Sequence, residues 1–212
     1  TMVIADGNLT GTTGSNYASG ASNCWFSTIG VSSGKWYGEF KESAGTNDQG
    51  QQIGVGYDLS KFQQGGTASA YNVGYIAEGW GYLGSEGTVV NNNSTVLSGL
   101  STWTVGDTIG IALDMDNHKL YFRKNGGSWE NSGNPESGST GTGAISLTTG
   151  ETYFFGNSDA SLSNTYTFQA NFGSPPFAIS SGNTDGNGYG NFEFEVPSGY
   201  FSLCTKNLAE YG

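Results

Sequence analysis

Apolar and polar residues alternate most regularly between residues 106 and 129, and this pattern predicts a β-hairpin. Four apolar side chains share one face of the incoming strand: Ile109, Ile111, Leu113 and Met115. After a turn at residues 116–118, Leu120 and Phe122 continue the alternation in a returning strand. The turn residues Asp, Asn and His tolerate positive φ better than other non-glycine types. A hairpin with one apolar face has to bury it against a second sheet, so the pattern predicts a layered β-protein.

Other segments with the same two-residue period predict further strands. The firmest is 165–172, where Tyr166, Phe168 and Phe172 share a face with Ala170. The remaining expected strands are residues 24–29, 35–40, 53–57, 71–77, 79–83, 89–90, 145–147, 152–155 and the C-terminal strands between 192 and 208. Gly54 and Gly56 alternate with large residues, which indicates close packing or a bend on that side of the strand. No long run has the spacing of an amphipathic helix, so we expect little or no helix.

The composition agrees with this interpretation. The chain has 212 residues, of which 36 are glycine, while only 12% are charged. Short strands joined by Gly, Ser, Asn and Thr turns give such a composition, and one all-β domain often reaches this length. The sequence shows no linker-like change in composition. We therefore expect one two-sheet antiparallel β-sandwich domain spanning residues 1–212.

The charge balance excludes some classes of partner. The formal net charge is −11, with seven Lys and Arg residues together. Binding to nucleic acid depends on many basic contacts to phosphates, so nucleic acid is not an expected partner. No apolar run approaches the length of a transmembrane helix and no secretory signal opens the chain, so we expect no membrane insertion.

Two cysteines lie near opposite ends of the chain, Cys24 and Cys204. A disulfide bridge between them is geometrically possible if the two ends of the domain meet. The alternative is two small, buried or half-buried side chains, since the sequence lacks the cysteine density of a disulfide framework.

Several of these segments together resemble the SPRY (B30.2-related) domain. Residues 34–40 (GKWYGEF) resemble its GKWYxEx strand, residues 53–56 its IGV strand, and residues 106–126 its GDxIGxALDxDNxxLYFxKNG hairpin. The resemblance covers about residues 24–178, and Gly38 departs from it because the family more often has a bulky residue there. It implies a concanavalin A-like jelly-roll sandwich that acts as a binding module without catalysis or cofactor.

The end of the chain resembles a narrower group. Residues 168–178 and 196–208 are similar to the FNFGQRPF…PPGFxxLxTxNLP ending of SPRY domains in tailed-phage virion proteins, with an insertion at residues 180–191 that interrupts the usual spacing. This resemblance implies a place on the surface of a virus particle, on its tail, fibre or head. The implied partners are other virion proteins, a host-surface glycan or a host receptor, and a homo-oligomer stays open.

Loops at one end of the sandwich are the expected contact surface. On length and polarity, we select residues 58–70, 79–93 and 125–143. The individual candidates are aromatic residues and asparagines: Tyr71, Trp80, Tyr82, Asn91, Asn92, Asn93 and Trp129. Aromatic rings beside amides suit the faces and hydroxyls of sugars. Loops rich in Tyr, Gly, Ser and Asn are also typical of protein-binding surfaces, and the alternative for part of these aromatic residues is a place in the core.

Catalytic and metal-binding alternatives rest on few residues. Glu193 and Glu195 share one side of the expected strand at 192–196, at a spacing near that of a retaining glycosidase, whereas solvent-facing glutamates would give the same pattern. His118 is the sole histidine and lies in a turn, which gives a general base no water-excluding pocket. Two groups offer hard oxygens for calcium, namely Asp114, Asp116 and Asn117, and Asn183, Asp185 and Asn187. Neither group has the pattern of an EF-hand, and such residues are ordinary turn formers, so we expect no resident metal.

Overall fold

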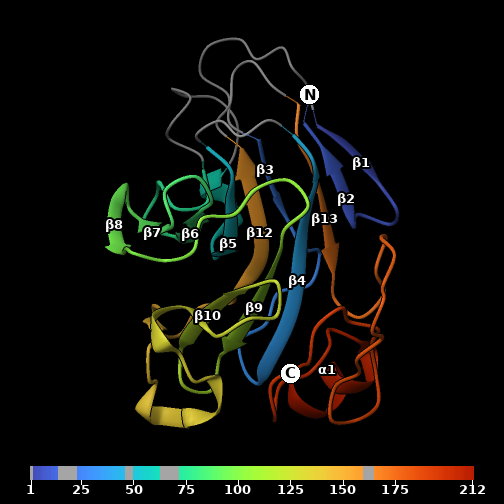
Figure 1. The fold of residues 1–212 in the computed structure, drawn as a ribbon. Helices are drawn as coiled ribbons and strands as arrows, with labels where there is room; N and C mark the ends of the chain where they lie inside the picture. The colour runs from blue at the N-terminus through green and yellow to red at the C-terminus, as the bar shows by residue number, and fades with distance from the viewer. Residues whose placement is uncertain (1, 14–22, 46–49, 63–71, 160–164) are drawn as a thin grey trace. The chain divides into compact units, whose positions relative to one another are not determined.

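The computed structural model describes residues 2–13, 23–45, 50–62, 72–159 and 165–212. The strands form two antiparallel sheets (Figure 1). In spatial order, the seven-stranded sheet consists of β1 (Val3–Ala5), β2 (Thr10–Thr12), β13 (Thr167–Asn171), β4 (Lys35–Ala44), β9 (Thr108–Asp114), β10 (Lys119–Lys124) and β11 (Ile145–Ser146). The six-stranded sheet consists of β3 (Asn23–Phe26), β12 (Phe154–Asp159), β5 (Gln52–Gly56), β6 (Gly79–Leu83), β7 (Thr88–Asn91) and β8 (Ser94–Leu97). The prediction of an all-β chain with two antiparallel sheets is confirmed.

Helical structure is short in the described part of the chain. The three 3₁₀ segments are η1 (Leu59–Phe62), η3 (Glu130–Ser132) and η4 (Pro135–Thr140), and the α-helix is α1 (Thr205–Tyr211). No helix within these residues is long and apolar enough to span a membrane.

Contacts divide the chain into two compact units. Unit 1 contains residues 1–30, 42–107 and 152–168, and unit 2 contains residues 31–41, 108–151 and 169–212. The six-stranded sheet belongs to unit 1, whereas β9, β10, β11 and α1 belong to unit 2. The expectation of a single domain over residues 1–212 stays a prediction.

In unit 1, β3 at the edge of the six-stranded sheet lies beside β12, and β12 beside β5 (Figure 1). Val55 pairs with Phe155 on one side and with Trp80 on the other, so these three side chains share a buried face. The opposite face carries glycines. A Cβ atom on Gly56 would lie 2.9 Å from the Phe62 ring and 3.0 Å from the Phe26 ring, which confirms the close packing predicted there.

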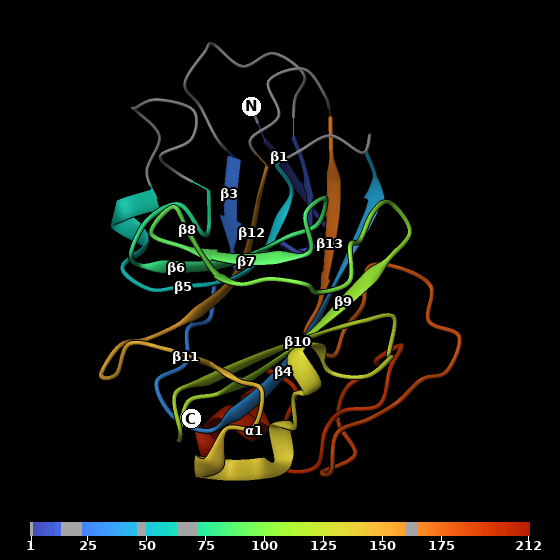
Figure 2. The same ribbon diagram turned by 60° about the vertical axis from the view of Figure 1, so that its left-hand side comes forward.

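Unit 2 contains the predicted hairpin. Leu113 pairs with Leu120 and Ile111 with Phe122 across β9 and β10, and His118 in the turn has φ 54°. In Figure 2, β4, β9 and β10 lie side by side. Every residue of β9 is buried, so the hairpin has two covered faces rather than the single one expected. The second face is covered by the chain after β13, which sequence alternation does not reveal.

Two expected strands are not formed. Residues 72–78 consist of turns and bends, because the backbone of this segment lies directly against glycines of β6. Residues 192–208 contain isolated bridges at Phe192 and Phe201, followed by α1. The backbone N–H groups of Glu193 and Phe194 donate to the side chain of Glu39, not to a neighbouring strand, which explains the absence of a ladder.

Both cysteines are free thiols in the structure. Cys24 lies in unit 1 and Cys204 in unit 2. Burial raises the pKa of the Cys24 thiol well above its usual range, which favours the protonated thiol at neutral pH.

Candidate binding surface

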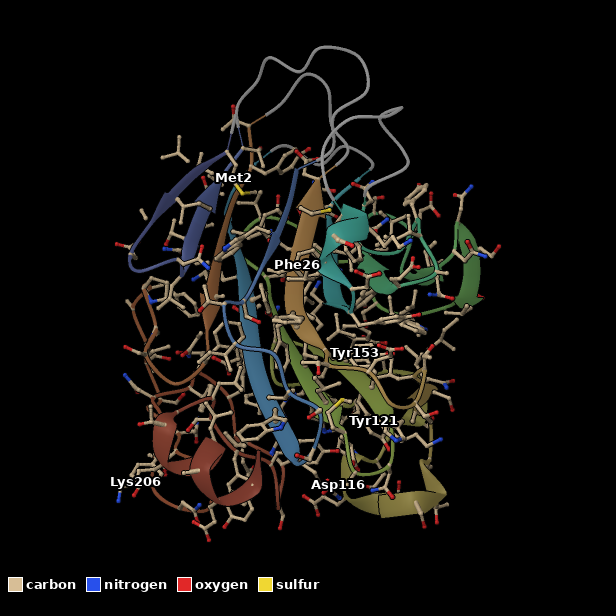
Figure 3. All side chains as sticks on the ribbon, turned by 180° about the vertical axis from the view of Figure 1, so that it is seen from behind. Met2, Phe26, Asp116, Tyr121, Tyr153 and Lys206 are labelled. Atoms are coloured by element: carbon tan, nitrogen blue, oxygen red, sulfur yellow. The ribbon has the colours of Figure 1, made fainter. Side chains whose placement is uncertain are left out.

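Two predicted site residues of unit 1 belong to its core. Trp80 is 6% exposed and its ring packs against Tyr57 and Tyr153, at centroid distances of 6.3 and 5.8 Å. Tyr82 is fully buried, with its hydroxyl donating to the Ser101 carbonyl. Tyr153, labelled in Figure 3, is itself fully buried and belongs to unit 1. Neither Trp80 nor Tyr82 presents a ring face at the surface, so neither can stack on a sugar.

The three candidate asparagines of unit 1 differ in role: Asn91 is structural, whereas Asn92 and Asn93 are exposed. Asn91 donates to the carbonyls of Ala77 and Gly79, at 3.1 and 2.8 Å, and so holds the turn before β6. Asn92 and Asn93 have φ values of 50° and 55° and form the exposed turn between β7 and β8. Their positive φ explains why asparagine occurs there. Tyr71, and residues 63–70 of the first candidate loop, lie outside the described residues.

Trp129 is the candidate that unit 2 contributes. It forms an antiparallel bridge with Arg123, and the Arg123 guanidinium lies 4.7 Å from the centre of its ring. Tyr121 meets the same ring edge to face at 6.4 Å. Trp129 is only partly buried, so it remains accessible while Arg123 and Tyr121 support its ring from beneath.

Beneath Trp129 lies a polar arrangement that sequence reasoning missed. Glu39, Gly110 and Arg123 are neighbours across β4, β9 and β10, and all three are buried. The Tyr37 hydroxyl lies 3.1 Å from Glu39 Oε1 and 3.0 Å from Arg123 Nη2, and thus connects the two charges. A Cβ on Gly110 would lie 2.8 Å from that hydroxyl, so glycine makes room for the connection. One signal was available in the sequence, because Arg123 is its sole arginine and lies in the best-defined hairpin.

This arrangement fixes the covering chain segment by its backbone. Glu39 accepts hydrogen bonds from the N–H groups of Phe194 at 2.8 Å and Glu193 at 3.0 Å, and Arg123 donates to the Glu195 carbonyl. The Asn171 amide also donates to Glu39, at 3.1 Å. Burial raises the pKa of Glu39, while these donated bonds act in the opposite direction. Burial, with the Glu39 charge, also raises the pKa of Tyr37, so its hydroxyl remains protonated.

The two carboxylates of the glycosidase alternative, Glu193 and Glu195, do not lie on a strand. The Glu193 carboxylate accepts from the Ser180 hydroxyl and backbone N–H, and these bonds lower the pKa of Glu193. Glu195 is exposed, and its backbone carbonyl accepts a hydrogen bond from Arg123. Because residues 192–196 form no strand, the spacing that suggested a glycosidase does not apply.

Carboxylates of both groups weighed as calcium ligands form hydrogen bonds or an ion pair within the protein. Asp185 accepts from Asn207 Nδ2 and the Ser202 hydroxyl, both at 2.8 Å, and from the Tyr189 N–H at 2.9 Å. Asp114 accepts from Lys35 at 3.2 Å and from Asn117 at 2.9 Å. Within the residues that the structure describes, no three His, Cys, Asp or Glu side chains are grouped as metal ligands.

Comparisons with known proteins point to one family. The model of the SPRY domain matches residues 35–141. Among solved structures, the SPRY domain of human HERC1 is similar with a TM-score of 0.58 at 20% identity, over 80% of this chain and 91% of that one. This likeness shows the fold, a SPRY-type β-sandwich. No curated protein matches the sequence. Because the family model covers half of the chain, including the hairpin and the Glu39 strand, this protein belongs to the SPRY family, whose domains are typically non-catalytic modules for protein–protein interaction.

Proposed function

We propose that this protein is a non-catalytic protein-binding module that acts on the surface of a virus particle, with residues 125–143 as part of its contact surface. The observation that carries the proposal is Trp129, a partly exposed indole that is fixed from beneath by Arg123 and Tyr121. Aromatic and arginine side chains of this kind dominate the binding energy of protein interfaces. A rigid base also reduces the entropy that is lost when the ring is immobilised by a partner.

The surroundings of Trp129 favour a protein partner over a glycan. The three residues that precede it in the chain, Gly126, Gly127 and Ser128, are small or polar, and all are exposed. Of the unit 1 aromatic rings that suggested sugar stacking, Trp80 and Tyr82 are buried. A net charge of −11 further favours a partner with a basic contact surface.

The C-terminal sequence supports a location on a virus particle. The resemblance of residues 168–178 and 196–208 to the ending of SPRY domains in tailed-phage virion proteins carries this part of the proposal. It makes structural proteins of the same particle the first partners to test.

The test is pairwise binding of the purified protein to those structural proteins, measured by biolayer interferometry beside a glycan array. We expect a protein partner whose affinity falls about tenfold or more in Trp129→Ala. The control is Tyr189→Ala, which removes an exposed aromatic ring of unit 2 that lies outside the proposed surface. Glycan binding that is lost in Trp129→Ala, with no protein partner, would overturn the proposal.

A further inference from the structure

Residues 180–212, here called the C-terminal segment, form several contacts among themselves and also pair with β4, where Tyr37 N–H donates to the Phe201 carbonyl and Phe201 N–H to the Lys35 carbonyl, both at 2.9 Å. Asn183 and Phe192 exchange two backbone hydrogen bonds of 2.8 Å. Asp185 connects this short hairpin to Ser202 and Asn207. Phe201 and Tyr211 stack at 4.0 Å, which fixes α1 against the preceding chain.

The C-terminal segment packs against the rest of unit 2. A second copy of this chain has the same contact residues. Glu39 and Arg123 hold three consecutive backbone groups, as described above. Phe192 meets the Tyr37 ring edge to face at 5.2 Å and belongs to a buried cluster with Val196 and Tyr200. At its far end, Ser198 N–H donates to Glu136 at 2.9 Å and the Tyr200 hydroxyl to the Pro135 carbonyl at 3.1 Å.

A short connection joins the segment to β13. It consists of residues 172–179, which contain Pro175 and Pro176 and form no helix or strand. Fully extended, these residues span roughly 25 to 30 Å. Two consecutive prolines favour an extended backbone over a return turn. The contacts of the connection include the Phe172 ring against Phe40 at a centroid distance of 5.8 Å, Lys41 over the Phe177 ring at 5.5 Å, and the Gln169 amide donating to the Pro176 carbonyl at 3.4 Å.

We propose that the C-terminal segment is an exchangeable unit, which can leave the groove formed by Tyr37, Glu39, Gly110, Ala112 and Arg123 and occupy the same groove of a second copy of this chain. The occupant follows from the groove itself, because Glu39 and Arg123 match the backbone of residues 193–195 and the space beside Tyr37 is filled by Phe192. Exchange preserves every contact within the segment and reforms every contact with the groove. Only the connection at residues 172–179 changes its path.

Within one chain, the connection keeps the C-terminal segment close to its own groove, which favours the closed monomer. A short connection gives an effective concentration on the order of 1 mM, so the exchanged dimer forms when the protein itself approaches that concentration. Shortening the connection weakens closure within one chain, and lengthening it favours the monomer.

The test uses two versions of the full chain, each with Cys24→Ala and Cys204→Ala. One version carries Glu136→Cys and the other Ser198→Cys, because these residues contact each other across the groove. The two are mixed at about 1 mM, diluted and treated with a short bismaleimide cross-linker, and the covalent dimer is quantified. The matched control replaces Ser198→Cys by Val96→Cys, an exposed position in unit 1.

We expect about tenfold more cross-linked dimer than in the control when residues 174–176 are deleted, and a smaller excess with the natural connection. Insertion of six Gly and Ser residues after Ser174 should remove the excess. If the shortened chain fails to fold, judged by its unfolding transition, the natural connection decides the question. A folded shortened chain that stays monomeric, or equal cross-linking of the Ser198 and Val96 versions with the natural connection, would overturn the proposal.

Discussion

Each unit contains a sheet face with glycines at its centre, but the two faces are covered in different ways. In unit 1, a Cβ on Gly79 would lie 1.8 Å from the Val73 carbonyl oxygen and one on Gly81 would lie 2.9 Å from Gly74 N. Here backbone lies on backbone, and the covering segment is close in sequence. In unit 2, the space over Gly110 is taken by Tyr37 and Arg123, which hold a segment from the end of the chain.

The difference concerns how a covering segment is positioned. The nearby segment of unit 1 is held by hydrogen bonds between uncharged groups, among them those from Val73 N to Ser158 at 2.9 Å, from Gly74 N to Gln52 at 2.7 Å and from Asn93 N to the Gly74 carbonyl at 3.2 Å. The distant segment of unit 2 is fixed by buried charged side chains that bind its backbone. We therefore expect unit 1 to be most sensitive to added volume and unit 2 to loss of polar groups.

The largest expected effect is that of Gly79→Ala in unit 1. The new methyl group would overlap the Val73 carbonyl, so the covering segment would have to move away, at a cost of about 3 kcal/mol in the free energy of unfolding. Urea unfolding followed by tryptophan fluorescence measures this loss. Gly186→Ala is the control, because nothing lies within 4 Å of its Cβ position. An unfolding midpoint for Gly79→Ala equal to that of the control would show that backbone contact does not define this face.

The second effect is that of Glu39→Ala in unit 2. The substitution leaves the N–H groups of Glu193 and Phe194 without their acceptor in a buried place, at a cost of about 2 to 3 kcal/mol. Hydrogen exchange should become faster at residues 193 and 194 before it does in β9. Glu195→Ala removes an exposed carboxylate nearby and should change stability by less than about 0.5 kcal/mol. Equal effects of the two substitutions would contradict the positioning role of Glu39.

Asp185→Asn tests the internal bonding of the C-terminal segment and carries a pH signature. Burial acts to raise the pKa of Asp185, but the bonds from Ser202, Tyr189 and Asn207 outweigh it and leave the pKa below its ordinary value. Stabilisation by a group of this kind is present above the unfolded-state pKa, about 3.9, and is lost as the pH falls through the folded-state pKa. We expect a loss of about 2 kcal/mol at pH 7, because the charge-assisted hydrogen bonds are weakened. The decline in stability below pH 4 should be smaller in Asp185→Asn than in the natural protein, and parallel pH profiles would exclude this role.

The same contrast explains what the sequence could predict. Alternation identified β9, β10 and β13 because each has at least one face of apolar residues, and the glycines of β5 indicated close packing. Alternation failed at residues 192–196, where Phe192 and Val196 are buried as expected but the backbone pairs with side chains instead of a strand. A two-residue period reports which side chains are buried and not what the backbone contacts.

The candidate site shows a related limit. Sequence pattern placed Trp80, Tyr82 and Trp129 in one class of aromatic loop residues, although the first two belong to the core. Whether an aromatic ring is exposed depends on residues distant in sequence, such as Tyr153 against Trp80. The connection from Glu39 through Tyr37 to Arg123 likewise joins three residues whose proximity depends on strand order, which composition does not contain.

The smallest effect on stability is expected for Trp129→Ala, at the rim of the covered face in unit 2. The ring contributes one cation–π contact with Arg123 and an edge contact with Tyr121, and it is partly exposed, so about 1 kcal/mol should be lost. Thermal unfolding scans of Trp129→Ala and Glu39→Ala rank the two losses of stability. A Trp129→Ala loss as large as that of Glu39→Ala would assign the indole to the core and remove the reason to regard it as a binding anchor. We expect Trp129→Ala to lose little stability but much binding affinity. This result would distinguish Trp129, which is available to a partner, from Glu39, which holds the backbone of residues 193 and 194 in place.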